Sequence, residues 1–231
     1  MDDKMNALKI RDLHFKYKDG RPGLAGVNLD CTKGSKVCLI GKNGSGKTTL
    51  LLNINCLLNG SGIIEVMGLR RSKQTAVEIR KKTGLLFSQV EHQFIMPDLI
   101  NDILLGTSGD LAGREKAIKI IKYFNLEIYS AKNPLELSAG EMKRAALAGI
   151  LVREPELLLL DEPLQNLDRE NSNKLAEILN SLEMTMLIAT HSRFVVENIA
   201  DHVAVMDSGK ISGYYSRDEA VKRKDVNDLL L

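Results

Sequence analysis

The sequence has no tryptophan, only five tyrosines and five phenylalanines, and a formal net charge of just +2. Proteins that bind single-stranded nucleic acid stack the bases on aromatic side chains and follow the backbone with clustered positive charge. The sequence offers neither feature in quantity. We therefore expect no nucleic-acid partner.

Cysteine and long hydrophobic runs are also scarce. The cysteines Cys31, Cys38 and Cys56 show no CxxC spacing and are accompanied by only four histidines, which argues against a zinc site. No apolar run approaches the roughly 20 residues that span a bilayer. The opening MDDKMNALKIRDL is too acidic for a secretory signal peptide. We expect a cytoplasmic chain with reduced thiols that reaches a membrane only through partners.

Short apolar runs alternate with helical patterns along most of the chain, which predicts an α/β fold with a mainly parallel core sheet. The predicted buried strands are VCLI (37–40), GLLF (84–87), LLLL (157–160) and MLIAT (186–190). The predicted helices cover 48–58, with a C-terminal cap at Gly60, then 141–152 and 169–182.

Other segments predict additions to this core within a single domain of residues 1–231. The first 35 residues and residues 62–68 have short, partly alternating strand patterns, which predict an antiparallel β subdomain. Residues 98–152 are rich in helical patterns and predict an inserted helical subdomain. Near the end, VAVMDSGKISGYY predicts a hairpin with a Ser-Gly turn.

The stretch VCLIGKNGSGKTTL fits G-x-x-x-x-G-K-[ST] between a predicted strand and a predicted helix. Its glycines let the backbone curl so that N–H groups point at an anion, and the helix adds its positive end. Lys47 offers a cation to the β- and γ-phosphates, the Thr48 hydroxyl suits Mg²⁺, and Thr49 can reach the α-phosphate. The expected nucleotide-binding residues are Gly41, Lys42, Asn43, Gly44, Ser45, Gly46, Lys47, Thr48 and Thr49.

Hydrolysis needs more than a binding loop, and LLLLDEP (157–163) supplies acidic residues at the end of an apolar strand. Asp161 can hold Mg²⁺ through water. Glu162 can polarise the attacking water, a role worth about 10²–10⁴ in rate. We expect Glu162 to be the general base.

The segment LSAGEMKRAALAGIL (137–151) allows two interpretations. Ser138 and Glu141 have the spacing of a capping box, which only starts a helix. A helix start that contains glycine and exposes its N–H groups is also an anion site.

Taken together, these motifs resemble the ATPase subunit of an ATP-binding-cassette (ABC) transporter over essentially the whole chain. GKNGSGKTT matches the Walker A loop, LLLLDE the Walker B strand with its catalytic glutamate, and LSAGE the LSGGQ signature. THS (190–192) matches the switch-histidine motif, and QNLD (165–168) falls where the D-loop does. Tyr17 lies where the family stacks an aromatic ring on adenine, although it fits an edge-strand aromatic equally well.

The resemblance implies a P-loop NTPase fold, ATP and Mg²⁺ as ligands, and a head-to-tail dimer with a second ATPase subunit. Lys47, Glu162 and His191 would be catalytic, with His191 holding the γ-phosphate. Ser138, Gly140 and Glu141 of the signature would lie at the partner's ATP, and Asp168 would belong to the D-loop. Because Ala139 and Glu141 depart from the signature, a non-identical partner and a homodimer both stay open.

Within the family, FSQVEHQFIMPDLINDILLG (87–106) resembles the ATPases of energy-coupling-factor (ECF) importers of vitamins and metal ions. In this alignment Ser88 takes the position of the Q-loop glutamine and Gln89 follows one residue late. Gln89 is our candidate for binding nucleotide and Mg²⁺, if the loop shifts.

We therefore expect an ATPase at the cytoplasmic face of a membrane, bound to transmembrane transporter subunits and energising import. Three alternatives are a conventional ABC transporter ATPase, a non-transport ABC ATPase, and a nucleotide-binding subunit without turnover. The single cassette, with no long coiled-coil insertion, argues against non-transport roles. Glu162 and His191 argue against lost turnover.

Overall fold

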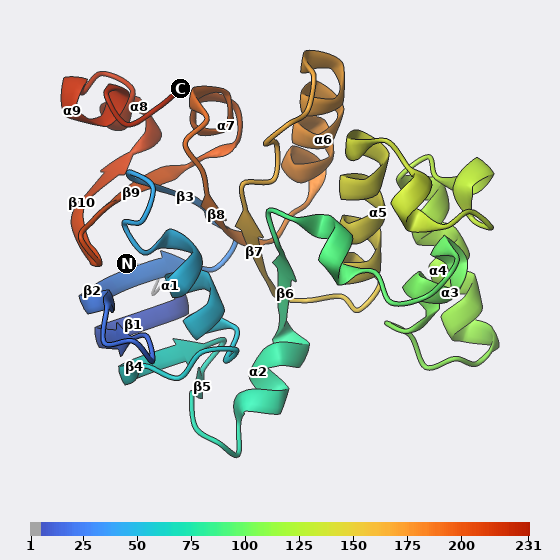
Figure 1. The fold of residues 1–231 in the computed structure, drawn as a ribbon, viewed down its shortest axis with the longest axis horizontal. Helices are drawn as coiled ribbons and strands as arrows, with labels where there is room; N and C mark the ends of the chain where they lie inside the picture. Colours follow the sequence, from blue (N-terminus) through green and yellow to red (C-terminus); the bar gives the residue numbers. More distant parts are fainter. Residues whose placement is uncertain (1–5) are drawn as a thin grey trace, which may run out of the picture.

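Two β-sheets of different character organise the chain (Figure 1), and the computed structural model describes residues 6–231. The larger sheet has six strands in the order β10-β9-β3-β8-β7-β6. All neighbouring pairs in it are parallel except β9 with β10. Its strands are β3 (Lys36–Ile40), β6 (Thr83–Leu86), β7 (Leu157–Asp161), β8 (Thr185–Ala189), β9 (His202–Asp207) and β10 (Lys210–Ser216).

Strands β6, β7 and β8 of this sheet are short, mostly apolar runs because both of their faces are covered. Every residue of β6, β7 and β8 is buried, as parallel strands between two layers require. The hairpin of β9 and β10 turns at Ser208 and Gly209, whose φ angles of 47° and 77° suit a tight two-residue connection. The predicted parallel core and the predicted hairpin are both confirmed.

The smaller sheet is antiparallel and has the order β2-β1-β4-β5. Leu8 and Ile10 of β1 lie opposite Val66 and Ile64 of β4, and all four side chains are buried. The predicted antiparallel sheet is confirmed. Its strands are β1 (Asn6–Lys16), β2 (Pro22–Thr32), β4 (Ser61–Val66) and β5 (Leu69–Arg70). The prediction that the opening segment is no signal peptide rests partly on residues 1–5, which lie outside the described residues.

Helices cover the sheets and extend to one side. Figure 1 shows α3, α4 and α5 grouped at one end of the long axis, with the antiparallel sheet toward the other. The α-helices are α1 (Lys47–Ile54), α2 (Ala76–Lys82), α3 (Leu99–Leu104), α4 (Leu111–Tyr123), α5 (Ala139–Leu151), α6 (Arg169–Ser181), α7 (Arg193–Ile199), α8 (Arg217–Ala220) and α9 (Lys224–Asn227). Three short 3₁₀ turns are η1 (Val90–Gln93), η2 (Glu127–Tyr129) and η3 (Pro134–Glu136).

One predicted helix boundary is wrong. Helix α1 ends at Ile54 and does not continue to a cap at Gly60. The Asn55 side chain donates to Thr83 Oγ1 across the fold (2.7 Å), and Cys56 takes a φ of 60°, which turns the chain out of the helix. The Gly60 N–H then binds the Asn53 side chain (2.8 Å).

Two hydrophobic cores lie on the two faces of the large sheet. One joins that sheet to α1 and the antiparallel sheet. The other joins it to the helices at the far end, where Phe124 and Ile103 are fully buried. No helix within residues 6–231 is both long enough and apolar enough to span a membrane.

Candidate functional site

Three neighbouring strands deliver the predicted chemical groups to one edge of the large sheet. Strand β8 pairs in parallel with both β3 and β7, so the carboxyl ends of all three strands lie side by side. The phosphate loop (residues 41–48) follows β3. Asp161 ends β7 and Glu162 comes directly after it, and His191 follows β8. This edge is where parallel α/β sheets bind ligands.

Two glycines of the phosphate loop are required by its shape. Gly41 has a φ of 151°, and a Cβ there would lie 2.1 Å from the Met206 carbonyl oxygen. Gly46 has a φ of 107°, and a Cβ there would lie 2.6 Å from the Gly23 carbonyl oxygen. Gly46 also leaves the start of α1 without a side-chain cap, so its first N–H groups are free to bind an anion.

Lys47 and Thr48 reach the same space from the first turn of α1. Lys47 is buried, and its Nζ donates to the carbonyls of Gly41 (2.6 Å) and Lys42 (3.3 Å). Burial lowers the pKa of Lys47, while the nearby Glu162 and Asp161 carboxylates act in the opposite direction. An ammonium whose hydrogen bonds to the described part of the chain all go to loop carbonyls is well placed to exchange them for phosphate oxygens.

Asp161 and Thr48 form the polar floor of the site. Thr48 Oγ1 donates to Asp161 Oδ2 (2.8 Å). Burial raises the pKa of Asp161, and the Thr48 hydrogen bond partly offsets that shift. Ser45 Oγ is buried nearby in the loop and has no hydrogen-bond partner within residues 6–231, so a bound oxyanion can satisfy it.

Glu162 and His191 form a pair at the edge of the site. His191 Nδ1 lies 2.7 Å from Glu162 Oε1. An ionised carboxylate only accepts hydrogen bonds, so Nδ1 carries the hydrogen and Nε2 is left for a ligand. Glu162 has a φ of 48°, an uncommon value for a residue with a side chain, and its N–H donates to the Ala189 carbonyl (2.9 Å). Such backbone strain gathers at functional sites.

These groups line one open cavity of about 850 Å³. Most of the predicted nucleotide and catalytic residues reach it. Its lining comprises Tyr17, Arg21, Pro22, Gly23, Asn43, Gly44, Gly46, Lys47, Thr48, Thr49, Ser88, Asp161, Glu162, Gln165 and His191. Gly41, Lys42 and Ser45 belong to the same loop but do not line the cavity: Gly41 and Ser45 are buried, and Lys42 is exposed.

The aromatic side of the cavity includes residues that the sequence pattern did not single out. The Tyr17 hydroxyl is hydrogen-bonded to Thr49 Oγ1, and the Arg21 guanidinium lies 5.8 Å from the Tyr17 ring centre. Arg21, Pro22 and Gly23 were missed because no motif marks the end of the β1–β2 connection or the start of β2. The pairing of β1 with β2 carries them over the phosphate loop.

The structure distinguishes Ser88 from Gln89. Ser88 lines the cavity, whereas Gln89 is exposed and does not line it. Contact of Gln89 with nucleotide or Mg²⁺ therefore stays a prediction that requires movement of the loop before η1.

The signature segment lies outside this chain's own cavity. The capping box is present: the Ser138 N–H donates to Glu141 Oε2 (2.9 Å), and Ser138 Oγ caps the first turn of α5. The Glu141 carboxylate also accepts from the Tyr129 hydroxyl, which with the Ser138 hydrogen bonds holds its pKa below the ordinary value. A Cβ on Gly140 would lie 2.5 Å from Asn171 Cγ, so α6 packs closely there.

Asp168 of the predicted D-loop caps the N-terminus of α6. Its carboxylate accepts from the Asn171 N–H (2.8 Å) and the Asn171 side chain (2.8 Å), and these bonds lower its pKa. Like Ser138 and Gly140, it does not line the cavity.

Comparison with known proteins agrees with this geometry. The family described as ABC transporter matches residues 24–165. A putative ABC transporter ATP-binding protein of Streptomyces avermitilis is 35% identical over 211 residues, covering 89% of this chain and 80% of the relative. The energy-coupling factor transporter ATP-binding protein EcfA of Methanocaldococcus jannaschii is 36% identical over 217 residues, covering 90% and 78%.

A solved structure extends the match to the fold. The structure of cbiO1 from Clostridium perfringens, described as part of the ABC transporter complex cbiONQ, has a TM-score of 0.84 at 30% identity. The match covers 96% of this chain and 92% of that one. The sequence motifs, the cavity that unites them and these comparisons agree: the chain belongs to the ABC transporter family and is one of its ATPase cassettes.

Proposed function

We propose that this ATPase energises a membrane transporter, specifically an ECF-type importer of a vitamin or metal ion. The observation that carries the catalytic part is the union of Lys47, Thr48, Asp161, Glu162 and His191 in one cavity. The phosphate loop and Lys47 hold the phosphates. Glu162 draws a proton from the attacking water, and His191 orients the Glu162 carboxylate through Nδ1.

The residues present fit Mg²⁺. The Thr48 hydroxyl and the Asp161 carboxylate are oxygen ligands already 2.8 Å apart, and Mg²⁺ prefers oxygen ligands. Within residues 6–231 no three His, Cys, Asp or Glu side chains cluster as a metal cage. That agrees with an ion held by one carboxylate together with substrate phosphates, whose charge it neutralises.

The signature supports a head-to-tail dimer with a second ATPase subunit. Ser138 and Gly140 lie outside this chain's cavity, at the N-terminus of α5, where N–H groups suit an anion. In the dimer they bind the ATP held by the other subunit. Closure on ATP and opening after hydrolysis are then a shift between two populated states. The altered residues Ala139 and Glu141 are compatible with a homodimer or with a non-identical partner.

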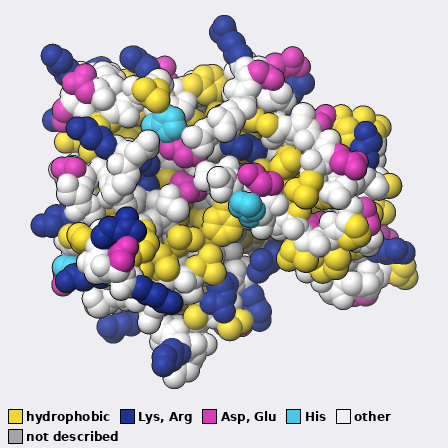
Figure 2. Space-filling model, viewed as in Figure 1, with side chains coloured by type: hydrophobic (Ala, Val, Ile, Leu, Met, Phe, Trp, Pro, Cys, Tyr) yellow, Lys and Arg dark blue, Asp and Glu magenta, His cyan; other side chains and the backbone are white. Residues whose placement is uncertain are grey.

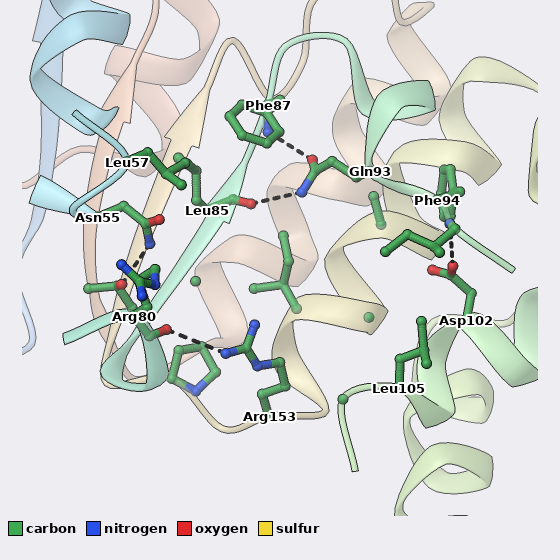
Figure 3. Close-up of a pocket in the computed structure, with 18 of the residues that line it drawn as sticks. Asn55, Leu57, Arg80, Leu85, Phe87, Gln93, Phe94, Asp102, Leu105 and Arg153 are labelled. Atoms are coloured by element: carbon green, nitrogen blue, oxygen red, sulfur yellow. Dashed lines mark hydrogen bonds between the residues drawn. The ribbon is translucent and has the colours of Figure 1, made fainter. Parts of the chain in front are cut away.

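A groove beside the catalytic cavity suits a transmembrane subunit. It has a volume of about 570 Å³ and lies between β6 and the helices α3 and α5 (Figure 3). The Gln93 side chain fixes its upper wall by accepting from the Phe87 N–H (2.9 Å) and donating to the Leu85 carbonyl (2.9 Å). Since Ser88 and η1 connect this wall to the catalytic cavity, a segment seated here senses the state of the nucleotide.

The lining of the groove indicates the chemistry of its occupant. Leu57, Phe94 and Leu105 are apolar, whereas Arg80 and Arg153 place two guanidinium groups along one side (Figure 3). Hydrophobic side chains also gather toward the middle of the face shown in Figure 2. We infer an apolar helical segment that carries an acidic side chain, supplied by a transmembrane subunit. The chain then sits peripherally at the cytoplasmic face.

The ECF assignment is supported by the EcfA relative and by cbiO1, together with the stretch 87–106. The alternative is the ATPase of a conventional ABC transporter, which uses the same catalytic cavity. The two differ in the membrane proteins that they bind.

Co-purification from detergent-solubilised membranes tests this proposal. The tagged chain should retain a scaffold membrane protein and a small separate substrate-binding membrane protein. Two large permeases would instead show the conventional transporter, and no membrane protein would overturn both. Arg153→Glu should release the partner without lowering the ATPase activity of the free chain. Arg114→Glu, exposed on α4 away from the groove, is the matched control. Undiminished retention by Arg153→Glu would refute the docking surface.

A further inference from the structure

Lys143, on the signature helix α5, is a buried lysine outside the cavity lining described above. The residue is only 4% exposed. Lysine is rarely buried without a carboxylate partner, yet Lys143 forms no ion pair within residues 6–231. Its Nζ donates instead to two main-chain carbonyls, those of Glu162 (2.9 Å) and Gln165 (2.8 Å).

Both carbonyls belong to the turn that presents the catalytic carboxylate. The Glu162 carbonyl also accepts from the Gln165 N–H (3.2 Å), and the Glu162 N–H is bound to the Ala189 carbonyl (2.9 Å). Glu162 has the uncommon φ of 48°. A strained residue keeps its conformation only when its surroundings over-determine it. Lys143 is the one side chain among the described residues that hydrogen-bonds the carbonyl of Glu162.

We propose that Lys143 is a positioning residue that fixes the backbone of Glu162 and of the D-loop (residues 165–168) from the signature helix. It keeps the Glu162 side chain aimed at His191 Nδ1 and at the attacking water. Burial lowers the pKa of Lys143 to about 8, and carboxylates including Glu162 and Glu91 resist that shift. The ammonium is therefore mainly charged at neutral pH and donates strongly to carbonyls.

The location of Lys143 gives this anchor a second consequence, which rests on the proposed dimer. Gly140 and Lys143 are three residues apart on α5 and so share one side of the helix. Where Ser138 and Gly140 bind the partner's ATP, Lys143 joins that contact to this chain's own Glu162. Nucleotide bound in one site thereby supports the catalytic geometry of the other.

The test compares Lys143→Met, Lys143→Arg and the exposed control Lys119→Met by steady-state ATP hydrolysis, ATP binding and thermal unfolding. Lys143→Met removes both donations and should lower kcat about 10- to 100-fold, the worth of a charged hydrogen bond. KM for ATP should stay near wild type, because Lys47 and the phosphate loop are untouched. Lys143→Arg should recover part of the rate, since a guanidinium also donates to two carbonyls. Lys119→Met should behave like the wild type in all three assays.

A double variant separates positioning from simple loss of fold. If Lys143 acts through Glu162, adding Lys143→Met to Glu162→Gln should lower kcat no further. The inference would be overturned if the kcat losses of the two substitutions multiplied in the double variant. It would also be overturned if Lys143→Met had a normal kcat, or if its loss of kcat only matched the fraction of the protein that is unfolded. If Glu162→Gln itself keeps full activity, the proposed catalytic role fails instead.

Discussion

Replacing Glu162 by glutamine removes the proposed base while leaving its surroundings in place. Glutamine has the same size, and its amide oxygen can still accept from His191 Nδ1, which lies 2.7 Å from the carboxylate. The backbone contacts to Ala189 and Lys143 do not involve the side chain. The carboxylate is only 13% exposed, and its recorded side-chain partner is His191. We expect kcat to fall about 10²–10⁴-fold, or about 3–5.5 kcal/mol in activation free energy.

Phosphate release under saturating ATP measures kcat, and a fluorescent ATP analogue measures binding. Binding should persist, because Lys47 and the phosphate loop keep their contacts. Glu78→Gln, a carboxylate exposed on α2, is the matched control and should hydrolyse ATP normally. Wild-type turnover by Glu162→Gln would refute the assignment of Glu162 as base. If the variant lost ATP binding as well as turnover, Glu162 would also be needed for the shape of the cavity and not only for the chemical step.

Three further outcomes follow from the packing and charges of the fold. Gly46→Ala should abolish ATP binding, measured by the same fluorescent analogue, because its Cβ would lie 2.6 Å from the Gly23 carbonyl oxygen at a φ of 107°; retained affinity would contradict the loop geometry. Phe124→Ala should lower the free energy of unfolding by about 3–5 kcal/mol in denaturant titration, because the ring is fully buried among the helices. Glu141 is held below its ordinary pKa of 4.5 by Tyr129 and its capping contacts, so its stabilisation is present above that pH and is lost as the pH falls through the folded-state pKa. Glu141→Gln should therefore make the free energy of unfolding depend less on pH on the acidic side, and an unchanged pH dependence would count against this linkage.

Local patterns in the sequence determined much of the architecture. Apolar runs such as LLLL (157–160) are buried strands because a parallel sheet covers both of their faces. The Ser138–Glu141 capping box formed as its spacing predicted, since its partners are three residues apart. The motifs also predicted most of the residues that line the cavity, because the phosphate loop, Asp161 with Glu162, and His191 lie at the ends of three neighbouring strands of one sheet.

Contacts between distant residues decided the rest. Helix α1 stops at Ile54 because Asn55 is bound by Thr83, 28 residues away. Ser88 lines the cavity and its neighbour Gln89 does not, a difference that the sequence pattern did not reveal. In the sequence, Lys143 is one polar residue of a helical pattern. Only the fold brings its ammonium to the carbonyl of Glu162, which lies 19 residues further along the chain. Periodicity reports which face of a segment is buried, whereas only the folded chain determines which distant groups meet there.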